Sequence, residues 1–133
     1  METLTAVHSA LQADPDVCLA VVFGSSARGT GSESSDLDIG VSGVPPHRLP
    51  ALSVSLSRLA RREVDLIPLD SAPPLLRFEI ARDGVLLTER EAGLWSTFQA
   101  RAMVDWWDWA PSARRFAGAA MVRLSSRTSS RTR

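Results

Sequence analysis

Two aspartates separated by one residue, Asp36 and Asp38, stand in the apolar run SDLDIGV at residues 35–41. Because side chains alternate along a strand, a strand here would point both carboxylates to one face. Aspartate is depleted in strands, and two on one face repel each other unless a cation lies between them. Hard oxygen ligands suit Mg²⁺. A third aspartate, Asp65, follows in the apolar run EVDLI at residues 63–67, so the sequence predicts a cation site.

A glycine-serine pair, Gly24-Ser25, ends the apolar run VCLAVVF at residues 17–23. This run is typical of a strand buried on both faces. Glycine allows a sharp turn and the close approach of a ligand, and Ser25 would begin a short helix whose free N–H groups bind phosphate. An ordinary turn and solvated aspartates are the alternative interpretation. The combination of a phosphate turn, a carboxylate pair and a third strand aspartate favours a functional site.

The order of these residues resembles a known family. Gly24-Ser25, ten further residues, the Asp36-Leu37-Asp38 triplet and then Asp65 are similar to the nucleotidyltransferase superfamily related to DNA polymerase β. The resemblance covers roughly residues 17–90. The small size of the chain is similar to that of the minimal nucleotidyltransferases, the antitoxin halves of HEPN/MNT toxin–antitoxin pairs.

The resemblance implies nucleotidyl transfer from a nucleoside triphosphate bound to Mg²⁺. Asp36 and Asp38 would hold two metal ions roughly 3.5–4 Å apart. Asp65 would complete the metal that activates the acceptor hydroxyl, and it is the candidate base. The three aspartates are therefore expected to be both the metal ligands and the catalytic residues.

The same resemblance assigns the triphosphate to the turn after residues 17–23. Ser25 and the backbone from Gly24 to Ser26 would hold the β- and γ-phosphates. Arg28 would pair with the triphosphate or be a surface residue, and the sequence leaves both interpretations open.

Related antitoxins move AMP from ATP onto a tyrosine of a partner HEPN ribonuclease, so the resemblance implies ATP as substrate and such a toxin as partner. This chain has no tyrosine and cannot be its own tyrosine acceptor. Two alternatives stay open: an antitoxin that neutralises its toxin by binding alone, and a small-molecule nucleotidyltransferase of the antibiotic-modifying type. No direct role with nucleic acid is expected.

The 133 residues carry no net formal charge, but the charge is uneven. Residues 1–109 hold nine arginines and fifteen acids, a net charge of −6, whereas residues 110–133 hold six arginines and no acid. We expect one domain at 1–124 and a disordered basic tail at 125–133. The single cysteine, the lack of a signal-peptide pattern and the lack of a long apolar run predict a cytoplasmic protein without a membrane span.

The pattern of apolar residues predicts an α/β fold of the polymerase β-like nucleotidyltransferase type. A small mixed sheet of three to four strands would come from residues 17–23, 36–42, 62–68 and 85–88, with flanking helices at 3–13, at the leucine stripe from Leu49 to Leu59 and at 75–82. The first two strands should be antiparallel neighbours. A right-handed crossover should then place the third strand parallel to the second, with Asp65 level with Asp38.

The C-terminal part, about residues 91–124, is predicted to be helical. Apolar side chains recur there every three or four residues and form one stripe: Trp95, Phe98, Ala102, Trp106 and Trp109. This stripe is either core packing or a partner interface, since tryptophan is enriched at interface hot spots. Pro111 is expected to end the first helix, with another helix at 113–124.

Overall fold

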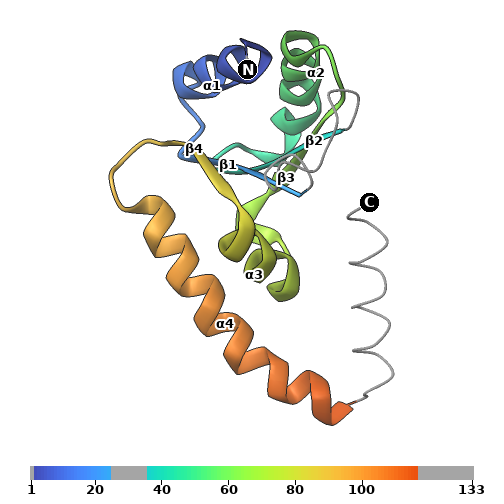
Figure 1. Cartoon of the computed structure of the whole chain (residues 1–133), viewed down its shortest axis with the longest axis vertical. Helices are drawn as coiled ribbons and strands as arrows, with labels where there is room; N and C mark the ends of the chain where they lie inside the picture. The colour runs from blue at the N-terminus through green and yellow to red at the C-terminus, as the bar shows by residue number, and fades with distance from the viewer. Residues whose placement is uncertain (1, 25–35, 117–133) are drawn as a thin grey trace.

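The structure is a computed structural model that describes residues 2–24 and 36–116. The elements follow in the order α1 (Glu2–Ala13), β1 (Leu19–Phe23), β2 (Leu37–Ser42), α2 (Leu49–Ala60), β3 (Val64–Pro68), α3 (Pro74–Asp83), β4 (Val85–Glu89) and α4 (Leu94–Phe116). Two short 3₁₀ helices, η1 (Pro46–Arg48) and η2 (Leu69–Ser71), precede α2 and α3. Figure 1 shows the sheet between the α1/α2 pair and α3, with α4 running past α3 and away from the sheet.

The four strands form one mixed sheet in the order β3-β2-β1-β4. β1 pairs antiparallel with both β2 and β4, and β2 pairs parallel with β3. The helix α2 makes the crossover between the two parallel strands. This arrangement confirms the predicted α/β fold, the antiparallel first pair and the parallel third strand.

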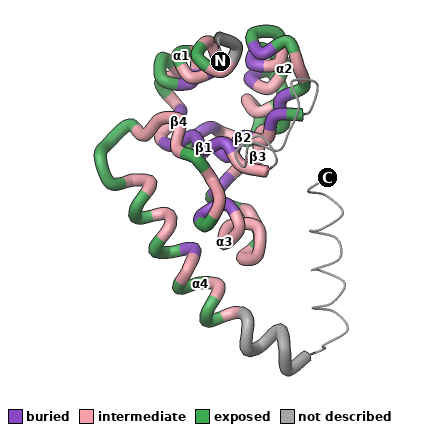
Figure 2. The backbone as a smooth tube through the Cα atoms, in the orientation of Figure 1, coloured by how far each residue is buried: buried purple, intermediate pink, exposed green. Residues whose placement is uncertain are grey.

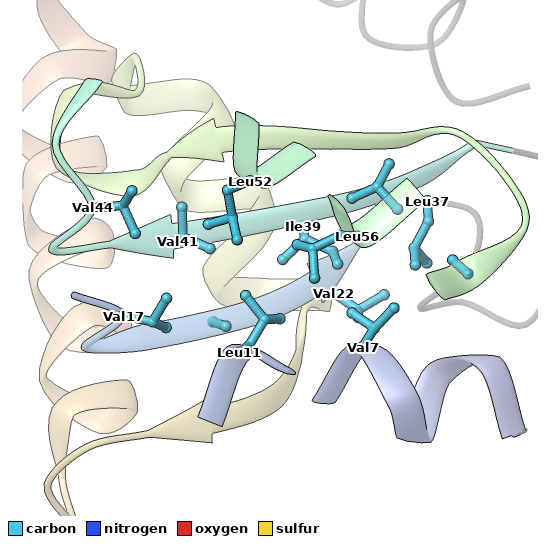
Figure 3. Packing of buried hydrophobic residues seen from close by; sticks show 13 residues of the cluster. Val7, Leu11, Val17, Val22, Leu37, Ile39, Val41, Val44, Leu52 and Leu56 are labelled. Carbon is cyan, nitrogen blue, oxygen red and sulfur yellow. The ribbon is translucent and has the colours of Figure 1, made fainter. Parts of the chain in front are cut away.

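One face of the sheet is closed by α1 and α2. Apolar residues at alternate strand positions meet the helix stripes there, because side chains two apart on a strand share a face. The cluster joins Val7 and Leu11 of α1 and Leu56 of α2 to Ile39 of β2, all with no exposed surface. Figure 2 shows buried residues along the sheet and on the two helices, and Figure 3 shows their side chains interdigitating.

The opposite face is covered over only part of its length. Leu19 and Val21 of β1 pack with Leu69 and Ile80, and Trp95 and Phe98 lie against this cluster. A Cβ on Gly40 would lie 2.5 Å from Leu69 Cδ2, so the glycine lets η2 lie directly on β2. The covering chain thus reaches Gly40, two residues beyond Asp38 on the same face.

An ion-pair clamp joins the end of α1 to the start of α2. The Arg48 guanidinium donates from Nη1 to Asp14 Oδ1 at 3.0 Å and from Nη2 to Asp14 Oδ2 at 2.9 Å. Nη1 also donates to Asp16 Oδ2 at 2.7 Å. Hydrogen bonds from Arg48 hold the pKa of Asp14 below its ordinary value, and the same contacts raise the pKa of Arg48. The clamp fixes how the two helices lie over the sheet.

The helix α4 continues through Pro111 to Phe116, so the prediction that Pro111 ends this helix is wrong. Proline removes one backbone hydrogen bond and interrupts a helix only locally, and the preceding turns of α4 are held by packing against α3. Phe78 of α3 stacks on Trp106 with ring centroids 5.3 Å apart, and Arg77 donates to Asp105 at 3.0 Å.

The stripe on α4 is buried or half-buried along its described length, and no exposed face of it is tested as a partner interface. Ala102 is buried, and Trp95 and Phe98 pack against the second cluster. Trp106 is half-buried between Phe78 and Trp109. Trp107, which lies off the stripe, is 66% exposed. The first turns of α4 are therefore core, and Trp107 adds one exposed aromatic side chain further along the helix.

Over residues 2–24 and 36–116, none of the helices combines the length and the apolar character needed to cross a membrane.

Candidate active site

The turn after β1 brings backbone directly against a carboxylate. Gly24 has φ +78°, a conformation that side-chain-bearing residues rarely adopt. A Cβ at this position would lie 2.7 Å from Asp38 Oδ2. The antiparallel register explains this contact, because Phe23 is the partner of Asp38 and Gly24 follows it. Glycine is required here both for the backbone conformation and for the space.

Two of the three predicted aspartates lie side by side on neighbouring strands. Asp38 and Asp65 are direct partners in the parallel β2–β3 register, as the crossover predicted. Asp36 precedes β2 and is exposed, Asp38 is half-buried, and Asp65 is exposed. Because Asp36 and Asp38 are two positions apart, all three carboxylates belong to the partly covered face of the sheet.

The remaining predicted site residues, Ser25, Ser26 and Arg28, lie outside the described residues. Over residues 2–24 and 36–116, no three side chains of the His, Cys, Asp and Glu types gather closely enough to hold a metal ion. The register brings Asp38 and Asp65 together, and Asp36 stands at the entry to β2 rather than beside them.

The residues on this face have the chemistry that Mg²⁺ requires. Their donors are carboxylate oxygens, which are the hard ligands that the ion prefers. The absence of a side chain at Gly24 lets the backbone of the turn lie directly against Asp38, where a Cβ would meet the carboxylate at 2.7 Å. Asp38 and Asp65, with Asp36 at the entry, would be the residues to hold the ion.

Two serines of α2 hold the strand that carries Asp65. The backbone N–H of Val64 donates to Ser57 Oγ at 2.9 Å, Ser57 Oγ donates to the Ser53 carbonyl at 2.8 Å, and Ser53 Oγ donates to the Val64 carbonyl. Both outward backbone groups of Val64 are therefore satisfied one residue before Asp65. Sequence reasoning missed this pair, although serines four apart share a helix face.

The comparison with protein families gives a clear result. The pattern of the family described as "Polymerase beta, Nucleotidyltransferase" matches residues 6–92, which is more than half of the 133 residues. The chain therefore belongs to this family of nucleotidyltransferases. The match contains Gly24, Asp38 and Asp65. Among curated proteins, the comparison finds no match.

Solved structures with the same fold come from toxin–antitoxin complexes. A chain of a toxin–antitoxin complex with AMP-PNP is 20% identical with a TM-score of 0.75, covering 90% of this chain and 96% of its own. A chain of the MntA–HepT complex is 19% identical with a TM-score of 0.73, covering 90% and 97%. A complex of a tri-AMPylated Shewanella oneidensis HEPN toxin with its MNT antitoxin gives 19% identity and a TM-score of 0.71, covering 91% and 99%. At these identities the likeness establishes the fold.

Proposed function

We propose that this protein is a Mg²⁺-dependent nucleotidyltransferase that acts as an antitoxin. It would transfer AMP from ATP to a hydroxyl group, that of a tyrosine, on a partner HEPN-type toxin ribonuclease. The main support for the proposal is that Gly24, Asp38 and Asp65 lie next to one another on three neighbouring strands. Gly24 follows β1 and contacts Asp38 of β2, and Asp65 of β3 is the register partner of Asp38. The family match supports nucleotidyl transfer, and the AMPylated HEPN toxin in one of the similar complexes supports the acceptor.

The chemical step is an in-line displacement. The acceptor hydroxyl oxygen forms a bond to the α-phosphorus of ATP, the bond from this phosphorus to the bridging oxygen breaks, and pyrophosphate leaves. Asp65 receives the hydroxyl proton. Mg²⁺ bound by Asp36, Asp38 and Asp65 would neutralise the charge on the reacting phosphoryl oxygens. The protein mainly positions the two substrates.

The triphosphate would be held at the turn that follows β1. Gly24 provides the close approach next to Asp38, and we propose that Ser25 and Ser26 contribute N–H and hydroxyl donors to the β- and γ-phosphates, with Arg28 pairing with the same group. N–H and hydroxyl donors that already point at the phosphates stabilise the negative charge that develops during the transfer, because they do not have to reorient.

The proposal can be tested by co-expressing the chain with the toxin encoded beside it and measuring the intact mass of the toxin. Wild type is expected to add mass in AMP steps and Asp65→Asn to add none, while both copurify with the toxin. The substitution removes one charge from an exposed residue and should leave the fold unchanged. Toxin neutralised equally by both proteins without added mass would make this chain a binding antitoxin and would refute the transfer.

A further inference from the structure

The helix α4 carries a second row of apolar side chains, which points away from the body of the protein. Ala102 is buried and Trp106 packs on α3, whereas Ala100, Val104 and Trp107 are exposed. These three residues are spaced by four and then three positions, so they share one face of the helix. Val104 is 52% exposed and Trp107 is 66% exposed. We call this face the outer row, and Figure 2 shows exposed residues recurring along α4.

Two oppositely charged residues flank the outer row on the same edge. Arg101 comes one residue after Ala100. Asp108 comes one residue after Trp107, so the two charges stand on the same side of the row and are seven positions apart. Both are exposed, and within the described part of the chain neither forms an ion pair. The midpoint between the two charges lies next to Val104.

This spacing makes the outer row complementary to a second copy of itself. When two identical helices run antiparallel about a two-fold axis, the same edge of each helix meets its counterpart. An axis beside Val104 would place Arg101 of each copy opposite Asp108 of the other. Each Trp107 would cover the stretch between Ala100 and Val104 of the other copy, where the side chains are small. A parallel pair would bring different edges together and leave these charges apart.

The same charges argue against a partner of strong charge. Arg101 and Asp108 lie at equal distances from the centre of the outer row and cancel each other. A basic segment would therefore be attracted by one of them and repelled by the other, and so would an acidic segment. A second copy in the antiparallel arrangement satisfies both residues at once.

We propose that the outer row of α4 is the interface of a symmetric dimer of this chain, in which the two helices pack antiparallel. Exposed tryptophan at the centre of such a face is typical of the residues that contribute most to an interface. The dimer goes beyond the nucleotidyl transfer and does not depend on it, because Asp38 and Asp65 lie on β2 and β3 rather than on α4.

Paired charge reversals test this arrangement, with the mass in solution measured by sedimentation equilibrium over rising micromolar concentrations. Wild type is expected to reach the mass of two chains. Arg101→Asp alone and Asp108→Arg alone each place like charges together twice, because the interface is symmetric. Either variant should raise the dissociation constant about tenfold or more. An equimolar mixture of the two variants restores both ion pairs and should form the dimer again.

A control and an apolar variant complete the set. Arg58→Asp makes the same charge change at an exposed residue of α2 and should dimerise like wild type. Trp107→Ala should raise the dissociation constant about tenfold or more, since it removes the central side chain from both copies. At concentrations where wild type is monomeric, Trp107→Ala should leave thermal unfolding unchanged.

A wild type that stays monomeric at every concentration would overturn the proposal. A mixture of Arg101→Asp and Asp108→Arg that is no more dimeric than its separate components would overturn it as well. The remaining occupant is a toxin encoded beside this chain. If wild type alone is monomeric, and Arg101→Asp and Trp107→Ala lose a toxin that copurifies with wild type, the outer row binds the toxin and the dimer is wrong.

Discussion

The two faces of the sheet differ in what covers them. Neighbouring residues of one strand point to opposite faces and therefore have different surroundings. Ile39 on β2 has no exposed surface under α1 and α2. Asp38, one residue earlier, points to the other face, where the covering chain reaches only Gly40. The covered face supplies stability, and the open end of the other face leaves carboxylates accessible to a ligand. Substitutions on the two faces should therefore have separable effects.

The largest effect on stability is expected on the covered face. Leu56→Ala removes a fully buried side chain from the cluster under α2 and should lower the free energy of unfolding by about 3–4 kcal/mol. Chemical denaturation would measure this. Asp65→Asn, on the open face, should change it by no more than about 0.5 kcal/mol. A similar loss in both variants would contradict the division between the faces.

At the turn after β1, Gly24→Val should weaken nucleotide binding by about tenfold or more, because the new side chain meets Asp38 and blocks the approach of phosphate. Gly93→Val is the matched control. Gly93 has φ +98°, and a Cβ there meets no atom within 4 Å. Both variants bear the backbone strain, and only Gly24→Val should lose affinity in equilibrium titration with ATP and Mg²⁺. Equal affinities in the two variants would remove the turn from the site.

A smaller contrast is expected between two adjacent tryptophans of α4. Trp106→Ala loses the stacking on Phe78 and the tilted ring contact with Trp109 and should destabilise the fold by about 1–2 kcal/mol. Trp107→Ala changes a residue that is 66% exposed and should stay within about 0.5 kcal/mol. Thermal unfolding compares them. A greater loss from Trp107→Ala would show that the packing of α4 on α3 is misassigned.

The smallest effect is expected at the clamp between α1 and α2, and it should depend on pH. The pKa of Asp14 is lowered in the folded protein by hydrogen bonds from Arg48. Its contribution is therefore complete above the unfolded pKa of about 3.9 and is lost as the pH falls through the lower folded pKa. The stability difference between wild type and Asp14→Asn should shrink below about pH 4. A difference that grows on acidification would contradict the clamp.

Much of the fold could be predicted because its signals are local. Apolar runs identified the strands, and the strand-helix-strand order predicted that Asp38 and Asp65 would be neighbours, which the register confirms. The continuation of α4 through Pro111 was not predicted, because a proline disfavours the interior of a helix when only the local sequence is considered.

The sequence predicted which residues form the site, but it did not predict how the neighbouring helix packs around them. The roles of Asp36, Asp38 and Asp65 as ligands stay predictions, as do those of Ser25, Ser26 and Arg28. The hydrogen bonds between Val64 and the side chains of Ser53 and Ser57 depend on the packing of α2 beside β3, which the local sequence does not show.

We expect the open face of the sheet to bind a nucleotide together with Mg²⁺. The most direct measurement is the thermal unfolding midpoint with a non-hydrolysable ATP analogue, with and without Mg²⁺, in wild type, Asp38→Asn and Asp65→Asn. A ligand that binds only the folded state raises its stability. Wild type should show a Mg²⁺-dependent rise in its midpoint, and both variants should lose this rise while their midpoints without ligand stay close to that of wild type. A full Mg²⁺-dependent rise in both variants would contradict it.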